Sequence, residues 1–259
     1  MFNLENFQNK FLTLVDQKTL SLILSYVVFG SVARGKGISK DSDIDTVLVT
    51  KKDLSFEELT ILGNYMCTLD NELGHHIDNI IVSKDEVYNI LSPNLLLSAY
   101  RDGYLLYGSD IREDFYKYLK AMNQSALING LLSTLSLKRH WHRKFILNKN
   151  SHNLSTSNLN YLTKAVVHRA RDYVAIVQDP FIKDLDKSLE IFENIFDDPN
   201  TINLPRICMD LRLGKQTIEE EKYSELLRDS YHFIELITKL CEKKYLEVSG
   251  EKEVKLKVF

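Results

Sequence analysis

One segment of the sequence constrains the fold more than any other: residues 29–49, FGSVARGKGISKDSDIDTVLV. Residues 25–29 (SYVVF) lead into it and residues 43–49 (DIDTVLV) end it, and both are rich in β-branched and aromatic side chains. Each therefore predicts a strand. Gly30 and Ser31 follow the first strand directly. We expect a strand, a glycine turn, and a second strand that begins with two acids.

Two common phosphate-binding motifs do not account for this segment. Residues 30–37 (GSVARGKG) almost match the P-loop pattern, but Gly37 stands where that loop requires a serine or threonine. An acidic strand also follows, in place of the long helix of a P-loop protein. In a dinucleotide-binding glycine motif, Lys40 would occupy the position of the third glycine.

The acids of the second strand suggest a cation site. Side chains two residues apart on a strand point to the same face, so Asp43 and Asp45 lie side by side while Ile44 turns to the core. Two parallel carboxylates repel each other unless a cation lies between them. A third acid, Asp78, lies in the predicted strand 75–82 (HHIDNIIV), where a charge is costly unless it is paired or bound to a metal.

The glycine turn suggests a phosphate site beside these acids. Gly30 and Ser31 are small residues that allow a phosphate to approach main-chain N–H groups. Arg34, four residues after Gly30, can face the same negative charge. The segment thus combines features that bind phosphate with features that bind a cation.

The remaining sequence predicts two domains. An amphipathic helix over residues 3–20 precedes the first strand, and a helix over residues 54–69 precedes the strand that carries Asp78. A short helix, a helix opened by Pro93 and an edge strand at 103–108 complete the first domain, residues 1–108. Residues 109–259 have almost entirely helical periodicity. The helices expected there cover about residues 123–147, 159–178, 182–196, 202–213 and 218–245.

These residues resemble the motif of the nucleotidyltransferase superfamily. That family includes DNA polymerase β, aminoglycoside nucleotidyltransferases and the minimal nucleotidyltransferases of toxin–antitoxin pairs. Its members have a hydrophobic residue and Gly-Ser or Gly-Gly, a gap, and an acid-hydrophobic-acid strand. Here Phe29 and Gly30-Ser31 are followed by eleven residues and then Asp43-Ile44-Asp45. Residues 30–35 (GSVARG) look most like the aminoglycoside and minimal branches. The resemblance covers roughly residues 1–108.

The resemblance implies a role for each matching residue. Asp43, Asp45 and Asp78 would be the catalytic acids and the ligands of two Mg²⁺ ions, with Asp78 completing the second metal site or accepting the proton of the attacking hydroxyl. Gly30, Ser31, Arg34 and Ser42 would bind the nucleotide. Antibiotic-modifying members often have glutamate at the third position. Because Asp78 is one methylene shorter, it fits the role of a metal ligand better than that of a base.

The resemblance also implies a fold and a reaction. The fold would be an α/β (α+β) nucleotidyltransferase domain with a mixed sheet, followed by an all-α bundle that binds the acceptor. The reaction would be Mg-dependent transfer of a nucleoside monophosphate, AMP from ATP, to a hydroxyl with release of pyrophosphate. The favoured acceptor is a small molecule of the aminoglycoside kind. The alternatives are an RNA (tRNA) or protein acceptor, as in toxin–antitoxin systems, and a nucleotide-binding scaffold without turnover.

Charge gives the RNA alternative its support. The net charge of −3 excludes a histone-like or polyacidic protein. However, residues 115–171 contain ten lysines and arginines and no acid, which requires an anionic partner or an acidic neighbour. Residues 138–144 (KRHWHRK) could grip RNA phosphates and stack a base on Trp141, or reach the bound triphosphate. Alternatively, they form a solvated helix with Trp141 in the core.

Cysteine content and hydropathy suggest a cytoplasmic protein. The three cysteines, Cys67, Cys208 and Cys241, form neither a disulfide framework nor a metal motif. The longest apolar run, residues 20–30, is about half the roughly 20 residues that a membrane span needs. We therefore expect no membrane partner. Sequence leaves the oligomeric state open.

Overall fold

A computed structural model describes residues 3–35 and 43–254 of the chain. They form two compact units, Met1–Ala121 and Met122–Phe259. Sequence placed the domain boundary between residues 108 and 109. The next helix, α7 (Arg112–Ala121), packs against α6 (Pro93–Asp102) within the first unit. In the described part of the chain, no helix has the length and apolar character needed to cross a bilayer.

The first unit is built on a four-stranded sheet in the order β3-β2-β1-β4. β1 runs antiparallel to both of its neighbours, whereas β2 and β3 are parallel. One end of the sheet therefore gathers the end of β1 with the starts of the other three strands. The strands are β1 (Ile23–Val28), β2 (Ile44–Thr50), β3 (Ile77–Ser83) and β4 (Tyr104–Gly108).

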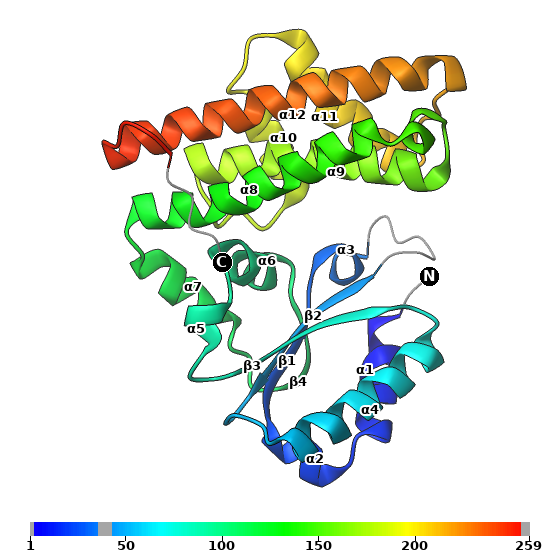
Figure 1. Cartoon of the computed structure of the whole chain (residues 1–259), viewed down its shortest axis with the longest axis vertical. Helices are drawn as coiled ribbons and strands as arrows, with labels where there is room; N and C mark the ends of the chain where they lie inside the picture. Colours follow the sequence, from blue (N-terminus) through cyan, green and yellow to red (C-terminus); the bar gives the residue numbers. More distant parts are fainter. Residues whose placement is uncertain (1–2, 36–42, 255–259) are drawn as a thin grey trace. The chain divides into compact units, whose positions relative to one another are not determined.

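Helices cover both faces of this sheet. Figure 1 shows α1, α2 and α4 on one side, with α6 and α7 on the other. On the first side, alternate strand residues such as Tyr26, Ile44 and Leu48 join a core with Phe7 and Phe11 of α1. The covering helices are α1 (Leu4–Leu14), α2 (Gln17–Leu22), α4 (Phe56–Leu73), α5 (Val87–Ile90), α6 and α7.

The predicted helix over residues 3–20 is two helices. α1 ends at Leu14, and Asp16 then caps α2 by accepting a hydrogen bond from the main-chain N–H of Thr19. A capping aspartate competes with continuation of the preceding helix, because its side chain offers the backbone another partner. The apolar periodicity of the sequence continues across the break between α1 and α2, so it did not reveal that break.

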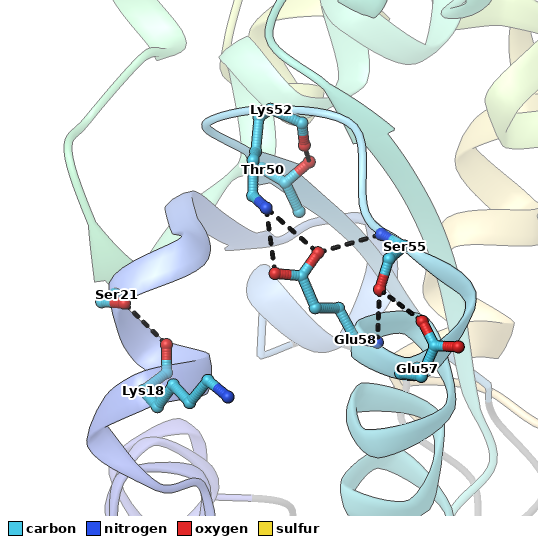
Figure 2. Close-up of polar contacts among 7 residues, drawn as sticks. All are labelled: Lys18, Ser21, Thr50, Lys52, Ser55, Glu57 and Glu58. Carbon is cyan, nitrogen blue, oxygen red and sulfur yellow. Dashed lines mark hydrogen bonds and ion pairs between the residues drawn. The ribbon is translucent and has the colours of Figure 1, made fainter.

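The parallel pairing of β2 and β3 requires a crossover, which α4 provides. A capping box fixes the start of α4: the Ser55 hydroxyl accepts from the N–H of Glu58, and the Glu58 carboxylate accepts from the N–H of Ser55 (Figure 2). Lys52, just beyond β2, donates to the same carboxylate at 3.0 Å. These contacts lie where β2 ends, at the opposite end of the sheet from its acids.

The second unit consists of helices, as expected. Most begin at a capping side chain, such as Asp198 before α11, whose carboxylate accepts from the N–H of Thr201. Together with the mixed sheet of the first unit, this confirms the predicted fold class. The elements are α8 (Gln124–Leu147), η1 (Lys149–His152), α9 (Thr156–Val177), α10 (Leu185–Glu193), α11 (Pro199–Arg212) and α12 (Glu220–Ser249).

A polar cluster in the first core joins three strands beside the acids. The side-chain oxygen of Asn79 on β3 accepts from the Thr46 hydroxyl on β2 at 2.6 Å and from the Tyr26 hydroxyl on β1 at 3.0 Å. Thr46 is fully buried. Since buried polar groups are costly when unpaired, this cluster favours a single strand register.

We expect Thr46→Val to lower the free energy of unfolding by about 1–2 kcal/mol, because it removes one of the two bonds to Asn79. Urea denaturation measures the change. Thr60→Val is the matched control, since Thr60 is an exposed residue of α4, and its effect should stay within about 0.5 kcal/mol. Equal effects in the two variants would contradict a special role for the cluster.

The second unit buries a histidine among aromatic rings. His142 on α8 is 1% exposed, and neither ring nitrogen has a hydrogen-bond partner among the described residues. Its ring stacks against Tyr161 at 6.2 Å between centroids. Burial, together with the positive charge of nearby Arg169, lowers the pKa of His142 from 6.5 to about 4. The imidazole is therefore neutral at pH 7.

We expect acid to destabilise this unit through His142. Its pKa falls from 6.5 in the unfolded chain to about 4 on folding, so its contribution is complete above pH 6.5 and is lost as pH falls toward 4. The loss is on the order of 3 kcal/mol. Unfolding followed at pH 7 and pH 4.5 should show a smaller drop in His142→Phe than in the wild type. His140→Phe, at an exposed histidine of the same helix, should leave the drop unchanged.

Candidate functional site

The glycine turn lies at the end of the sheet where β1 stops. Gly30 has a φ of +77°, a conformation that favours glycine, and it begins the four-residue helix α3 (Gly30–Ala33). The main-chain N–H of Phe29, just before the turn, donates to the carbonyl of Asp45 on β2 at 2.9 Å. This bond extends the pairing of β1 and β2 by one residue and holds the turn beside Asp45.

The main chain of Gly30 closely approaches the carboxylate of Asp45. A Cβ atom built on Gly30 would lie 2.5 Å from Oδ2 of Asp45. No real side chain tolerates that distance, so the residue must be glycine for the carboxylate to keep its place. Ser31, the next residue, is buried, with 6% of its surface exposed. The structure therefore places the Gly30 main chain against the acid, with Ser31 next in the chain.

Asp45 and Asp78 face each other across neighbouring strands. They are register partners in the parallel pairing of β2 and β3, so both side chains project from the same face of the sheet. Asp45 is partly buried and Asp78 is exposed. The apolar surroundings that sequence suggested for Asp78 do not bury it, because β3 is an edge strand.

The other predicted site residues are placed less completely. Asp43 is exposed and directly precedes β2, two residues before Asp45. Ser42 lies outside the described residues. In the described ranges 3–35 and 43–254, no three His, Cys, Asp or Glu side chains are arranged as a metal site. The described structure thus joins Asp45 to Asp78 by register and to Gly30 by contact, without gathering three acids into a cage.

The donor chemistry of these acids fits Mg²⁺. All the side chains concerned offer carboxylate oxygens, the ligands that a hard divalent cation prefers. The absence of a Cβ atom on Gly30 leaves the Asp45 carboxylate its place against the turn. Mg²⁺ usually keeps several waters and binds through one or two carboxylates together with substrate phosphates. A complete protein cage is therefore not required.

Arg34 forms an ion pair that sequence did not reveal. It is the C-cap of α3, and its Nη1 lies 2.5 Å from Oδ2 of Asp102, the last residue of α6. The side chain of Asp102 is 3% exposed and that of Arg34 is 15% exposed. In the sequence, Asp102 precedes a glycine at a helix end and resembles an ordinary helix terminus. Only the pairing of β4 with β1 brings it near the glycine turn.

The acid-free stretch 115–171 has acidic neighbours within its own unit. Lys138 pairs with Asp172 of α9, and Arg139 pairs with Glu242 of α12. Arg143 donates two hydrogen bonds of 2.6 Å to Glu235 of α12. The positive face of α8 is therefore largely neutralised by residues that follow the stretch in the sequence.

Trp141 is exposed, which excludes the interpretation that placed it in the core. It has 53% of its surface accessible, and neighbouring Leu137 has 49%. His142, one residue further along α8, is buried in its place. Lys144 has no acidic partner within ion-pair distance among the residues that the structure describes. One exposed aromatic residue and one unpaired lysine thus remain on this face.

Comparisons with known proteins relate the chain to a family model and to a known fold. Residues 9–99 match the family described as the nucleotidyltransferase domain. The chain is also similar to the spectinomycin adenyltransferase AAD(9) from Enterococcus faecialis, solved with ATP and spectinomycin. The sequence identity is 14% and the TM-score 0.56, over 90% of this chain and 100% of that one. At this identity the similarity shows a shared fold.

Two further solved structures are more distant. A toxin–antitoxin complex with AMP-PNP is 20% identical over 44% of this chain and 90% of that one, with a TM-score of 0.33. A nucleotidyltransferase-like protein from Exiguobacterium sibiricum 255-15 is 11% identical over 93% and 78%, with a TM-score of 0.34. These scores are too low to support an argument. No curated protein sequence matches the chain.

We expect Gly30→Ala to destabilise the first unit more than Gly35→Ala does. Both glycines have positive φ, +77° and +65°, so alanine is strained at either position by roughly 1–2 kcal/mol. Of the two, only Gly30 also has Asp45 in its way; a Cβ atom on Gly35 would have no described residue within 4 Å. Chemical denaturation should show an additional loss of about 1–3 kcal/mol in Gly30→Ala. Identical losses would mean that the approach to Asp45 imposes no constraint.

Proposed function

We propose that this chain, whose first unit is a nucleotidyltransferase domain, transfers AMP from ATP to a hydroxyl group of a small molecule. The nucleotidyltransferase class follows from the domain match, and the donor, the acceptor and the metal ion are our proposal. The observation that carries the proposal is the close approach of Gly30 to Asp45. Asp45 is in turn the register partner of Asp78 on the neighbouring strand.

The chemistry needs a group that accepts a proton and groups that accommodate negative charge. The acceptor hydroxyl attacks the α-phosphorus of ATP and a new P–O bond forms. The bond between the α-phosphorus and the oxygen that bridges it to the β-phosphorus breaks. Pyrophosphate leaves with the bonding electron pair, and the hydroxyl loses its proton. Negative charge accumulates on the entering and leaving oxygens, so a site for this reaction must stabilise both.

We assign these tasks to the residues that sequence singled out. Gly30 and Ser31 hold the β- and γ-phosphates close to the main chain, and Arg34 offsets phosphate charge. Asp43 and Asp45 bind Mg²⁺, with Asp78 completing the second metal site or receiving the proton of the hydroxyl. Bound Mg²⁺ supplies the positive charge that stabilises the developing oxyanions. The exposure of Asp78 is consistent with either task, because an acceptor or a solvated ion can reach it.

The proposed acceptor is a small molecule of the aminoglycoside kind. AAD(9), which shares its fold with this chain over 90% of the chain's length, was solved with ATP and spectinomycin. The ion pairs between α8 and its neighbours leave less positive surface for RNA than sequence suggested. The three free cysteines, of which two are buried, fit the reducing cytoplasm in which we place this activity.

An RNA or protein acceptor is the second candidate. Exposed Trp141 with unpaired Lys144 favours it, because an aromatic ring beside a cation can stack a base and hold a phosphate. Binding to tRNA should then fall steeply with salt concentration. A nucleotide-binding scaffold without turnover is the third candidate and predicts nucleotide binding without pyrophosphate release.

The test is to incubate the full chain and Mg²⁺ with each labelled NTP in the presence of aminoglycosides, tRNA or no added acceptor. We expect ATP to give pyrophosphate and a labelled aminoglycoside. Asp45→Asn should lower the rate by at least about 100-fold, since a carboxamide is a poor Mg²⁺ ligand. Omission of Mg²⁺ should abolish turnover.

Asp53→Asn is the matched control for the same chemical change. Asp53 is exposed and follows β2 at its other end, so this variant should retain wild-type turnover. Full activity in Asp45→Asn would remove the acid from the mechanism. Label on tRNA or on the protein itself would replace the small-molecule acceptor by the second candidate.

A further inference from the structure

The ion pair between Arg34 and Asp102 joins two segments that border the candidate site. Arg34 ends α3, which begins at Gly30 against Asp45. Asp102 ends α6 and is followed by β4, whose first residue, Tyr104, pairs with Val28 at the end of β1. The pair therefore spans the sheet end at which the acids of β2 and β3 also lie. In addition, α3 packs directly against α6.

Asp102 is anchored by tight packing around the next residue. A Cβ atom on Gly103 would lie 2.1 Å from the carbonyl oxygen of Ala99 and 2.9 Å from Val27 on β1. The guanidinium of Arg112 on α7 also donates to the carbonyl of Gly103. The backbone that carries Asp102 thus has little room to move, and its carboxylate offers a fixed point for Arg34.

Stability alone does not explain why this pair is charged. Removing two charges from water costs free energy, and apolar residues of similar volume often replace buried ion pairs without loss of stability. A charged pair does provide direction, because a guanidinium held by one carboxylate keeps a defined orientation. Nη1 of the Arg34 guanidinium contacts Asp102, and 15% of the Arg34 side chain is exposed.

We propose that Asp102 is a positioning residue for the nucleotide site: its carboxylate holds the Arg34 guanidinium, and with it the end of α3, so that Arg34 faces the phosphates. This inference rests on the proposed function. It assigns a task to a residue outside the glycine turn and outside the three acids. Loss of the carboxylate removes this hold on the Arg34 guanidinium, and a misplaced binding group weakens recognition.

The test is calorimetric titration of the full chain with AMP-PNP and Mg²⁺, together with thermal unfolding. Asp102→Asn should weaken nucleotide affinity by about 10-fold or more, whereas Asp102→Glu, which keeps the carboxylate, should stay within about threefold of the wild type. Glu58→Gln is the matched control. It makes the same kind of carboxylate-to-amide change in the ion pair with Lys52 (Figure 2), at the far end of β2, and should leave affinity unchanged.

A double variant keeps the inference testable if Asp102→Asn folds poorly. Arg34→Met with Asp102→Asn removes both charges of the ion pair, a change that is often tolerated better than the loss of one partner. Because Asp102 acts through Arg34, the double variant should bind nucleotide as weakly as Arg34→Met alone. A purely structural pair predicts wild-type affinity in the double variant.

The outcomes separate the two proposals. A wild-type chain that binds no AMP-PNP with Mg²⁺ would overturn the proposed function and this inference together. A wild type that binds, with Asp102→Asn binding equally well, would overturn the inference and leave the proposed function standing. Wild-type affinity combined with a lower melting temperature in Asp102→Asn would make the pair structural only, which also overturns the inference.

Discussion

The arrangement of the first unit around Asp45 depends on the absence of a side chain at Gly30. Gly30 lets the main chain run against the Asp45 carboxylate, and the Phe29 N–H bond to the Asp45 carbonyl fixes the same two segments from the backbone side. A turn that contacts an acid so closely can present main-chain N–H groups and a carboxylate to one ligand. The sheet order then supplies Asp78 in register, and the end of α6 supplies Asp102. The arrangement of these acids relative to the turn follows from the close approach of Gly30 to Asp45.

Most candidate residues that the sequence singled out lie close together along the chain. Gly30, Ser31, Asp43 and Asp45 belong to one strand-turn-strand segment, so their spacing carried the information. Asp102 could not be found in this way. It reaches the turn only because β4 pairs with β1, and nothing local distinguishes it from the end of any helix. The exposure of Asp78 likewise depends on strand order, since the same apolar strand in the centre of the sheet would be covered.

Apolar periodicity predicted where the helices lie in the sequence better than which of their residues face the core. In α8, Trp141 was a candidate for the core, but the structure exposes it and buries His142. The charge asymmetry of residues 115–171 was real, yet its explanation lies in α12, about a hundred residues further along the chain. Long-range ion pairs of this kind leave no local signature. For the same reason, a basic stretch on its own is weak evidence for nucleic-acid binding.

The strand order also determines when the first unit can be completed during synthesis. β1 lies between β2, which follows it closely, and β4, which begins at Tyr104 and closes a loop of about eighty residues. A nascent chain can pair β1 with β2 early, but one edge of β1 stays open until residue 108 has left the ribosome exit tunnel. An open strand edge attracts other strands. The short strand β4 therefore closes a surface prone to aggregation when it pairs with β1.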